Sequence, residues 1–210
     1  MGLYKISLWQ MFLAGGPVMW PILLCSIFAF AIIFLKFRYL QSITINTQDF
    51  LSKVMEKVKR NETKEALAIC DSVKIPVANI LKAGILKYDR PRQQIMEAME
   101  DASLYEIPRL EKNLGALATI AHISPLLGLL GTVVGMIRCF QAIQAKVSGL
   151  SPVLSADLAS GIWQALLVTV AGLMVAIPSF IAYNYLVSRV NNYILEMEKA
   201  ATELANFLTE

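Results

Sequence analysis

The feature that most constrains this chain is the run from Leu158 to Val187, LASGIWQALLVTVAGLMVAIPSFIAYNYLV, which contains no charged residue. It is long enough to cross a bilayer, because a spanning helix needs about 20 apolar residues. Its small residues recur at steps of three or four and so share one helix face. They are Gly161, Ala165, Thr169, Gly172 and Ala176. Membrane helices associate through such faces, so we expect this helix to contact protein or a water-lined path.

Two further stretches also lack charge, residues 6–35 and 113–137. Hydrophobic residues make up 56% of the chain and charged residues 17%. Three uncharged stretches of this length predict three transmembrane helices. The predicted fold is therefore an all-α membrane protein whose long helices extend into a cytoplasmic helical layer.

The charged residues are concentrated between the first two spans. Acidic and basic side chains are interspersed there, which argues against a nucleic-acid site. The predicted organisation is 1–36 for the N-terminal tail and first span, 37–112 for a cytoplasmic helical region, and 113–141 for the second span. An outer (periplasmic) loop follows at 142–155, the third span at 156–188 and a cytoplasmic tail at 189–210.

The positions of lysine and arginine predict the orientation, since these residues favour the cytoplasmic side. They place residues 37–112 and the C-terminus inside, and the N-terminus and residues 142–155 outside. Lys36, Arg38, Arg109, Lys112, Arg189 and Lys199 flank the spans on the inner side. Arg138 is the one positive charge that disagrees with this orientation, and its long side chain can reach the outer interface.

The N-terminal segment is expected to be retained rather than cleaved. Its apolar run from Val18 to Leu35 is too long for a signal peptide, and no small-residue cleavage site follows it. We expect a first helix at about 14–36, with Trp9 and Trp20 near an interface. Gly15-Gly16-Pro17 predicts a bend or a helix start.

The charged region is expected to be helical. Asn61 is a plausible N-cap for ETKEALAIC, and Lys74 to Pro76 predicts a helix break. After a turn at residues 89–92, an apolar face formed by Ile95, Met99, Ala102 and Leu110 predicts one helix running to about Gln141. Pro108 is expected to kink this helix.

The second span also carries the signals of close helix packing. Gly128, Gly131 and Gly135 lie near one another on the helix, and the last two form a GxxxG motif. Pro125 precedes them and Pro178 lies in the third span, so kinks are expected at both prolines. Cys25, Cys70 and Cys139 are far apart without metal-ligand spacing, so we expect small buried side chains and no metal site.

Two segments resemble the MotA/TolQ/ExbB proton-channel family: SPLLGLLGTVVGMIRCF at 124–140 and ADLASGIWQALLVTVAGLMVAIPSFIAYNY at 156–185. The preceding ALAICDSVKIPVANILKAG and EIPRLEKNLGALATIA are similar to that family's cytoplasmic helices. The length and three spans resemble the ExbB and TolQ branch.

The resemblance implies a homopentamer in the bacterial inner membrane. Its second and third helices would line a pore that holds the single helices of two ExbD/TolR-like partner subunits. Proton passage through a partner Asp would drive rotation and deliver work to an outer-membrane process. Family pore threonines match Thr132 and Thr169, whereas the family's intramembrane Glu in GI-x-E-AL falls on Gln164. Gln cannot take up a proton near neutral pH.

The chain itself offers few titratable groups at membrane depth. Asp157 is either an outer-mouth acid or a helix-start acid, and His122 either serves a path or bonds to a neighbouring helix or the interface. We therefore expect the carboxyl to come from a partner. The alternatives are a non-conducting pentameric scaffold, an independent ion channel, and a helix bundle without transport. No nucleophile–base set, phosphate loop or cofactor motif is present in the sequence, so an enzyme is not expected.

Overall fold

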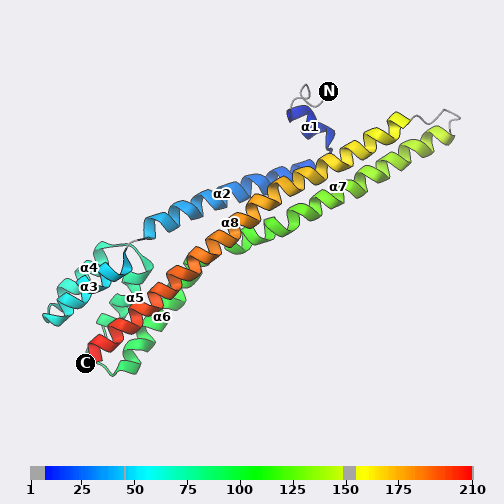
Figure 1. Cartoon of the computed structure of the whole chain (residues 1–210). Coiled ribbons are helices and arrows are strands. Elements are labelled where there is room, and N and C mark those ends of the chain that lie inside the picture. Colours follow the sequence, from blue (N-terminus) through cyan, green and yellow to red (C-terminus); the bar gives the residue numbers. More distant parts are fainter. Residues whose placement is uncertain (1–7, 45, 149–154, 210) are drawn as a thin grey trace. The chain divides into compact units, whose positions relative to one another are not determined.

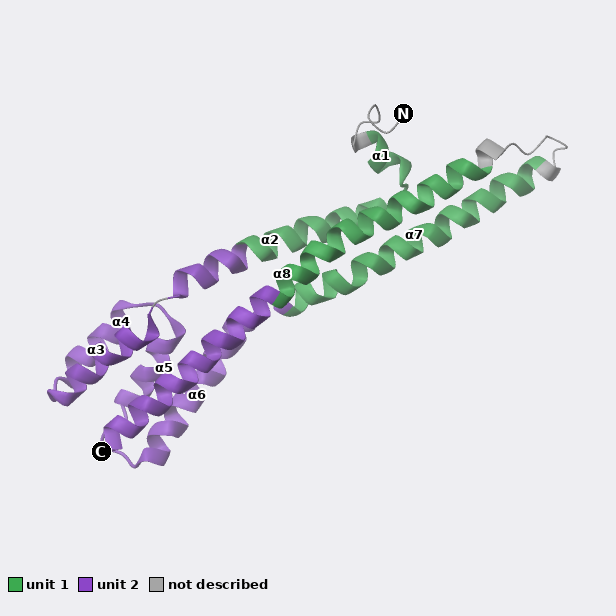
Figure 2. Cartoon of the chain, viewed as in Figure 1, with its two compact units in different colours: residues 1–34, 115–184 green, residues 35–114, 185–210 purple. Residues whose placement is uncertain are grey.

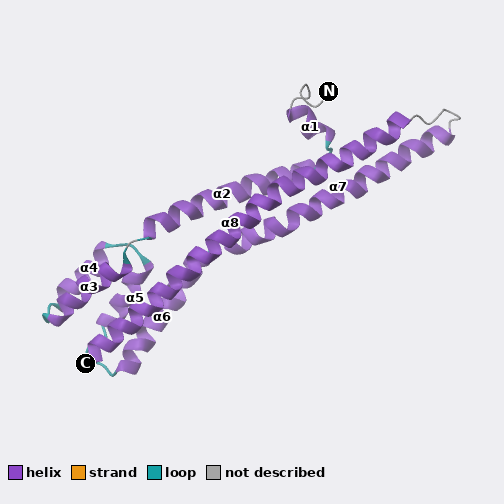
Figure 3. Ribbon diagram, viewed as in Figure 1, coloured by secondary structure: helices purple, strands orange, loops and turns teal. Residues whose placement is uncertain are grey.

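The computed structural model describes residues 8–44, 46–148 and 155–209, and within them every regular element is a helix (Figures 1 and 3). The helices are α1 (Leu8–Ala14), α2 (Met19–Ile43), α3 (Thr47–Lys59), α4 (Thr63–Ser72), α5 (Pro76–Ile85), α6 (Arg92–Glu111), α7 (Leu114–Ser148) and α8 (Ser155–Thr209). Three stretches of the described residues are long and apolar enough to cross a membrane: Met19–Lys59, Arg92–Lys146 and Leu158–Thr209. The predicted all-α fold with three spans is confirmed.

The chain divides into two compact units (Figure 2). Unit 1 comprises Met1–Phe34 and Gly115–Asn184, and unit 2 comprises Leu35–Leu114 and Tyr185–Glu210. Unit 1 contains most of the three uncharged runs, and unit 2 contains most of the charged residues. The assignment of each segment to one side of the membrane stays a prediction. The side chains of Trp9 and Asp157 and the loop residues 149–154 lie outside the described part of the chain.

The N-terminal bend is where the sequence predicts it. α1 ends at Ala14, α2 begins at Met19, and Gly16 between them has a φ of 75°. Glycine adopts this left-handed conformation without steric cost, which explains its presence at the turn. The predicted first helix at 14–36 needs correction at both ends, because α2 runs on to Ile43. Leu40 and Ile43 extend it, since both are buried within unit 2.

The single helix predicted from Arg92 to about Gln141 is wrong. α6 ends at Glu111, Lys112 has an extended ψ of 134°, and Asn113 has a φ of 68° before α7 begins. Asparagine is among the few non-glycine residues that tolerate this left-handed conformation. Pro108 lies inside α6, Pro125 inside α7 and Pro178 inside α8. Their effect on helix direction stays a prediction.

The predicted cap at Asn61 is also wrong. Asn61 has a φ of 60° and ends α3, while Glu62 precedes α4 without a side-chain cap bond. The Asn61 N–H donates to the Val58 carbonyl and the Glu62 N–H to the Lys57 carbonyl. These two bonds form a Schellman motif, which satisfies the last carbonyls of a helix. A residue in this left-handed conformation cannot also be the extended N-cap of the next helix.

Unit 2 has its own apolar core. Ile95, Met99 and Leu110 of α6 are buried as predicted, whereas Ala102 is half-buried. Residues 189–209 of the predicted C-terminal tail are helical and belong to α8, which reaches Thr209 and is about 80 Å long at 1.5 Å per residue. The buried side chains on this part of α8 recur at helical spacing and explain why it is ordered. They are Val190, Tyr193, Met197, Ala200, Ala201, Leu204 and Ala205.

A substitution in this part of α8 tests whether it is packed. Leu204→Ala should lower the free energy of unfolding by about 2–5 kcal/mol, because Leu204 is fully buried. Leu195→Ala, on the same helix but 48% exposed, should cost less than about 1 kcal/mol. Thermal unfolding of the two variants in detergent makes the comparison. Equal unfolding temperatures would show that this part of α8 is not packed.

Candidate functional site: the α7–α8 hairpin of unit 1

The small residues of α7 and α8 face one another within one chain. A Cβ added at Gly131 would lie 2.2 Å from Val168 Cγ1, and one at Gly135 would lie 3.1 Å from Ala165 Cβ. A Cβ at Gly161 would lie 2.7 Å from Cys139 Cβ. These pairs run in opposite directions along the two helices, so α7 and α8 form an antiparallel hairpin.

The backbones come closest near Gly128 and Gly172. A Cβ at Gly172 would lie 2.6 Å from the Ser124 carbonyl oxygen and 3.1 Å from Gly128 Cα. One at Gly128 would lie 3.1 Å from Thr169 Cα. Backbone atoms cannot rotate away as a side chain can, so this part of the hairpin admits only glycine without a shift of the helices.

The two predicted threonines lie differently in this hairpin. The Thr169 hydroxyl shares its single proton between the Gly128 carbonyl at 3.3 Å and the Ala165 carbonyl of its own helix at 3.4 Å. It therefore links the two helices. Thr132 Oγ1 donates to the Leu129 carbonyl at 2.6 Å within α7, one turn beyond Gly128. Both hydroxyls have an acceptor, so each can still accept a bond from water or from an acid.

Gln164 lies against the N-terminal bend. A Cβ at Gly16 would lie 2.6 Å from Gln164 Nε2 and 3.0 Å from an Arg138 guanidinium nitrogen. The bend is also held by a small apolar cluster of Met19, Ile22 and Val168. Sequence reasoning named Gln164, Arg138 and Gly16 separately but not their proximity, because nothing local relates Gly16 to α7 or α8.

His122 makes structural contacts in unit 1. Its Nδ1 lies 2.7 Å from the Ala118 carbonyl, which can only accept, so Nδ1 carries the proton. Its ring packs edge-to-face on Phe180 of α8, with ring centroids 5.9 Å apart. Ala176, the last small residue of the predicted stripe, is buried.

The outer surface of unit 1 is lined by large apolar side chains. Phe30 is 74% exposed and Met174 71% exposed. Bulky exposed residues on the remaining faces of the spans have the same character, and a bilayer or further helices can cover them. They include Phe28, Leu126, Leu129, Ile137, Phe140, Leu166, Val170, Ile177 and Ile181.

Unit 2 contains a buried carboxylate that the sequence did not suggest. The Glu106 side chain is 9% exposed, and its Oε1 accepts from Asn79 Nδ2 at 2.9 Å and from an Arg109 nitrogen at 3.1 Å. Lys36 Nζ donates to the Arg109 carbonyl at 3.4 Å. Burial and then Glu106 raise the pKa of Tyr39. A buried acid is tolerated when it is paired in this way, so the cluster ties α2, α5 and α6 together inside unit 2.

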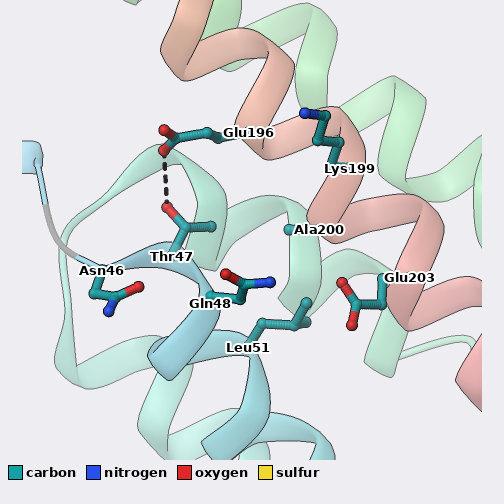
Figure 4. Close-up of a pocket in the computed structure, with 8 residues that line it drawn as sticks. All are labelled: Asn46, Thr47, Gln48, Leu51, Glu196, Lys199, Ala200 and Glu203. Atoms are coloured by element: carbon teal, nitrogen blue, oxygen red, sulfur yellow. Dashed lines mark hydrogen bonds between the residues drawn. The ribbon is translucent and has the colours of Figure 1, made fainter.

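A surface pocket in unit 2 lies between the start of α3 and α8 (Figure 4). It has a volume of about 370 Å³, and Thr47 Oγ1 donates to Glu196 across it at 3.3 Å. Lys199 and Glu203 add charges of both signs. Among the described residues, no three His, Cys, Asp or Glu side chains are placed to hold a metal ion.

The cysteines of the described chain are free thiols. Cys70 and Cys139 are buried, whereas Cys25 is half-buried. Burial raises the pKa of Cys70 to about 11, so its reactive thiolate is scarce at neutral pH.

Fold and hairpin together define a multi-pass membrane protein whose spans are built for close helix contact. A model of the MotA/TolQ/ExbB proton channel family matches residues 72–199, more than half of the chain. The chain therefore belongs to the MotA/TolQ/ExbB proton channel family, as the resemblance indicated. Proteins of this family are channels and not enzymes, which confirms the prediction that this chain is no enzyme.

Individual relatives agree with this assignment. The chain is 30% identical over 190 residues to an ExbB homolog of Methanothermobacter thermautotrophicus, covering 90% of this chain and 66% of that protein. It is 29% identical over 227 aligned positions to biopolymer transport protein ExbB of Salmonella typhimurium, covering 95% and 85%. It is 45% identical over 97 residues to Tol-Pal system protein TolQ of Haemophilus influenzae, covering 46% and 40%.

A pair of glycine substitutions tests the hairpin contact. Gly172→Ala should lower the free energy of unfolding by about 1–3 kcal/mol, because the new Cβ meets the backbone at Ser124 and Gly128. Gly115→Ala, also in a helix, places its Cβ in open space and should be neutral or stabilising by up to about 1 kcal/mol. Thermal unfolding in detergent reports both. A Gly172→Ala protein as stable as Gly115→Ala would refute the contact.

Proposed function

We propose that this chain is the stator and channel subunit of a motor driven by the proton-motive force. It works with a single-span ExbD/TolR-like partner and couples ion flow across the inner membrane to work at the outer membrane. The observation that carries the proposal is that the family match includes all of α7 and α8 as far as residue 199, where the predicted pathway residues Thr132, Gln164 and Thr169 carry hydroxyls and an amide.

The partner supplies the titratable group in this proposal. Between Lys112 and Arg189 the sequence has a single acidic residue, Asp157. His122 is held by Ala118 and Phe180. Thr132, Gln164 and Thr169 can bond to water or to a carboxylic acid but cannot carry a proton themselves near neutral pH. A path lined by this chain therefore needs a carboxyl from another helix, and the partner Asp is the candidate.

The available energy is sufficient for mechanical work. One elementary charge that crosses the membrane releases about 2.3 kcal/mol per 100 mV, before any pH gradient is added. Two or three protons therefore outweigh a single helix–helix contact of about 1–2 kcal/mol. Such a motor can break and remake contacts along the partner helices at each step.

The proposed assembly is a homopentamer around two partner helices, with the N-terminus periplasmic and the C-terminus cytoplasmic. The large apolar side chains exposed on α2, α7 and α8 support it, because an isolated chain leaves them uncovered. The glycine faces of α7 and α8 are already used within one chain. Contacts with the partner and with other copies therefore fall on the remaining faces, including the edge that carries Thr132.

A non-conducting pentameric scaffold is the second candidate. Gln164 favours it, because an amide stands where the family resemblance places an acid and lies beside the chain's own bend at Gly16. In that case the chain holds the partner helices without moving protons.

Proton uptake into vesicles separates these functions. Vesicles that contain the chain with its partner should acidify under an imposed potential, as reported by an internal pH-sensitive dye, and the chain alone should not. If the assembled complex shows no proton flux, the non-conducting scaffold is the remaining function. Flux from the chain without a partner would point to an independent channel.

Thr169→Val should reduce coupled proton uptake by at least about tenfold while the complex still assembles. Valine keeps the side-chain shape and removes one hydrogen bond, which costs the fold only about 0.5–1.5 kcal/mol. The control is Thr119→Val, which makes the same substitution in α7 and removes a bond within that helix, to the Gly115 carbonyl. Gel filtration confirms assembly of each variant. Equal uptake by both variants would exclude a role for Thr169 in the path.

A further inference from the structure

A second surface cavity of unit 2 is lined by charges of both signs. Its volume is about 350 Å³, which is within the size range of small-molecule sites. The side chains come from α2, α4, α5, α6 and the segment between α4 and α5, all inside unit 2. The polar ones are Tyr39, Asp71, Lys74, Asn79, Glu106 and Arg109.

Glu106 is the buried acid of this cavity. Its side chain is 9% exposed, and the bonds from Asn79 and Arg109 both go to Oε1. Oε2 has no partner among the described residues, so it can accept a bond from a ligand. A carboxylate oxygen favours a charged N–H donor, because such bonds are stronger than bonds between neutral groups. This part of the cavity therefore fits an ammonium group.

Two cations of the same cavity fit an anion. Lys74 is exposed and makes no ion pair within the described part of the chain. The Arg109 side chain is 68% exposed and uses one nitrogen for Glu106, so its other N–H groups can donate elsewhere. Asp71 is already paired with Lys82. Lysine and arginine both bind phosphate, so the cavity fits a ligand that carries a phosphate and an ammonium.

The cavity is close in sequence to the ends of two spans. Tyr39 follows the uncharged run 6–35 by four positions along α2, which is about 6 Å at 1.5 Å per residue. Arg109 precedes the uncharged run 113–137 by four positions. The headgroup layer extends about 5–8 Å beyond the hydrocarbon core on each side. The cavity is therefore within reach of phospholipid headgroups.

We propose that this cavity binds a lipid headgroup that carries both a phosphate and a primary ammonium, as in phosphatidylethanolamine. Lys74 and Arg109 bind the phosphate, and Glu106 Oε2 accepts a bond from the ammonium. Glu106 precedes Arg109 by about one helical turn and so lies further from the second span. This order matches a headgroup whose phosphate lies nearer the hydrocarbon core than its ammonium, while the acyl chains stay in the bilayer.

Lipid binding to the unmodified full chain tests the proposal without any variant. Native mass spectrometry in detergent compares phosphatidylethanolamine, phosphatidylcholine and phosphatidylglycerol with the same acyl chains. Phosphatidylcholine has no N–H to donate, and phosphatidylglycerol has no ammonium. Phosphatidylethanolamine should bind at least about tenfold more tightly than either, because a hydrogen bond to a charged group contributes about 1.5–3 kcal/mol. Equal or tighter binding of either of the other lipids would overturn the proposal.

Two substitutions assign the parts of the headgroup. Glu106→Gln keeps the side-chain shape and should bring the preference for phosphatidylethanolamine over phosphatidylcholine to within about twofold, because the charge-assisted bond is lost. Lys74→Gln should weaken binding of all three lipids about fivefold, because a lysine near the membrane surface contributes about 1 kcal/mol. Lys87→Gln is the control, since Lys87 is exposed in unit 2 and lies outside the cavity lining.

These variants can each contradict the proposal. An unchanged lipid preference in Glu106→Gln would overturn it, as would Lys74→Gln binding lipid as well as Lys87→Gln does. Thermal unfolding without added lipid checks that Glu106→Gln is folded, and Lys74→Gln changes an exposed side chain.

Free phosphoethanolamine separates a lipid from a water-soluble ligand with the same two groups. It should displace bound phosphatidylethanolamine only at concentrations at least about tenfold higher, because it lacks the acyl chains that partition into the detergent. Displacement at equal concentration would show that the cavity takes a soluble ligand and would overturn the assignment to a lipid. None of these measurements involves proton uptake, so their failure is distinguishable from failure of the proposed function.

Discussion

The close approach of α7 and α8 is the constraint on which the rest of unit 1 depends. Moving apolar side chains from lipid to a helix–helix contact gains little free energy, so two spans associate where their backbones can come close. Gly128 and Gly172 allow that contact, and a Thr169 hydroxyl bond to the Gly128 carbonyl closes it. The small residues contact one another within the chain, so the bulky residues lie on the outer faces of the helices. The surface left for lipid, partner helices and other copies follows from this one packing choice.

Under the proposed function, the same packing explains why the chain lines a path without driving it. Its described groups at membrane depth are hydroxyls, an amide, a histidine bonded to its own helix and one arginine. Such groups hydrogen-bond and set the local charge, but near neutral pH the hydroxyls, the amide and the arginine do not exchange protons with the two sides of the membrane. The proposed division of labour between this chain and a separate acid-bearing helix therefore follows from composition. The chain belongs to a proton channel family, and that membership supports the proposed role of the hairpin.

The spans and the glycine contacts were predictable because both are local patterns. Charge-free runs set the spans, and steps of three and four placed Gly161, Ala165 and Gly172 on one face. What could not be predicted depends on tertiary context. Asn113 and Asn61 adopt left-handed conformations that end helices, although each had a plausible helical role in the sequence. The packing of the charged end of α8 within unit 2 was also not predicted, because the residues that bury its apolar side chains lie elsewhere in the sequence. The meeting of Gly16, Arg138 and Gln164 joins three distant segments, which no local pattern reports.

Disulfide cross-linking is the most direct measurement of the central claim that the Thr132 edge of the hairpin faces an acid-bearing partner helix. A chain without its own cysteines would carry a single cysteine at position 132 or at position 30, where Phe30 is the most exposed residue of α2's apolar face. The partner would carry one cysteine beside its intramembrane Asp. Cross-linking at position 132 and none at position 30 is the predicted result. Cross-linking at position 30 alone would place the hairpin away from the partner and contradict the claim.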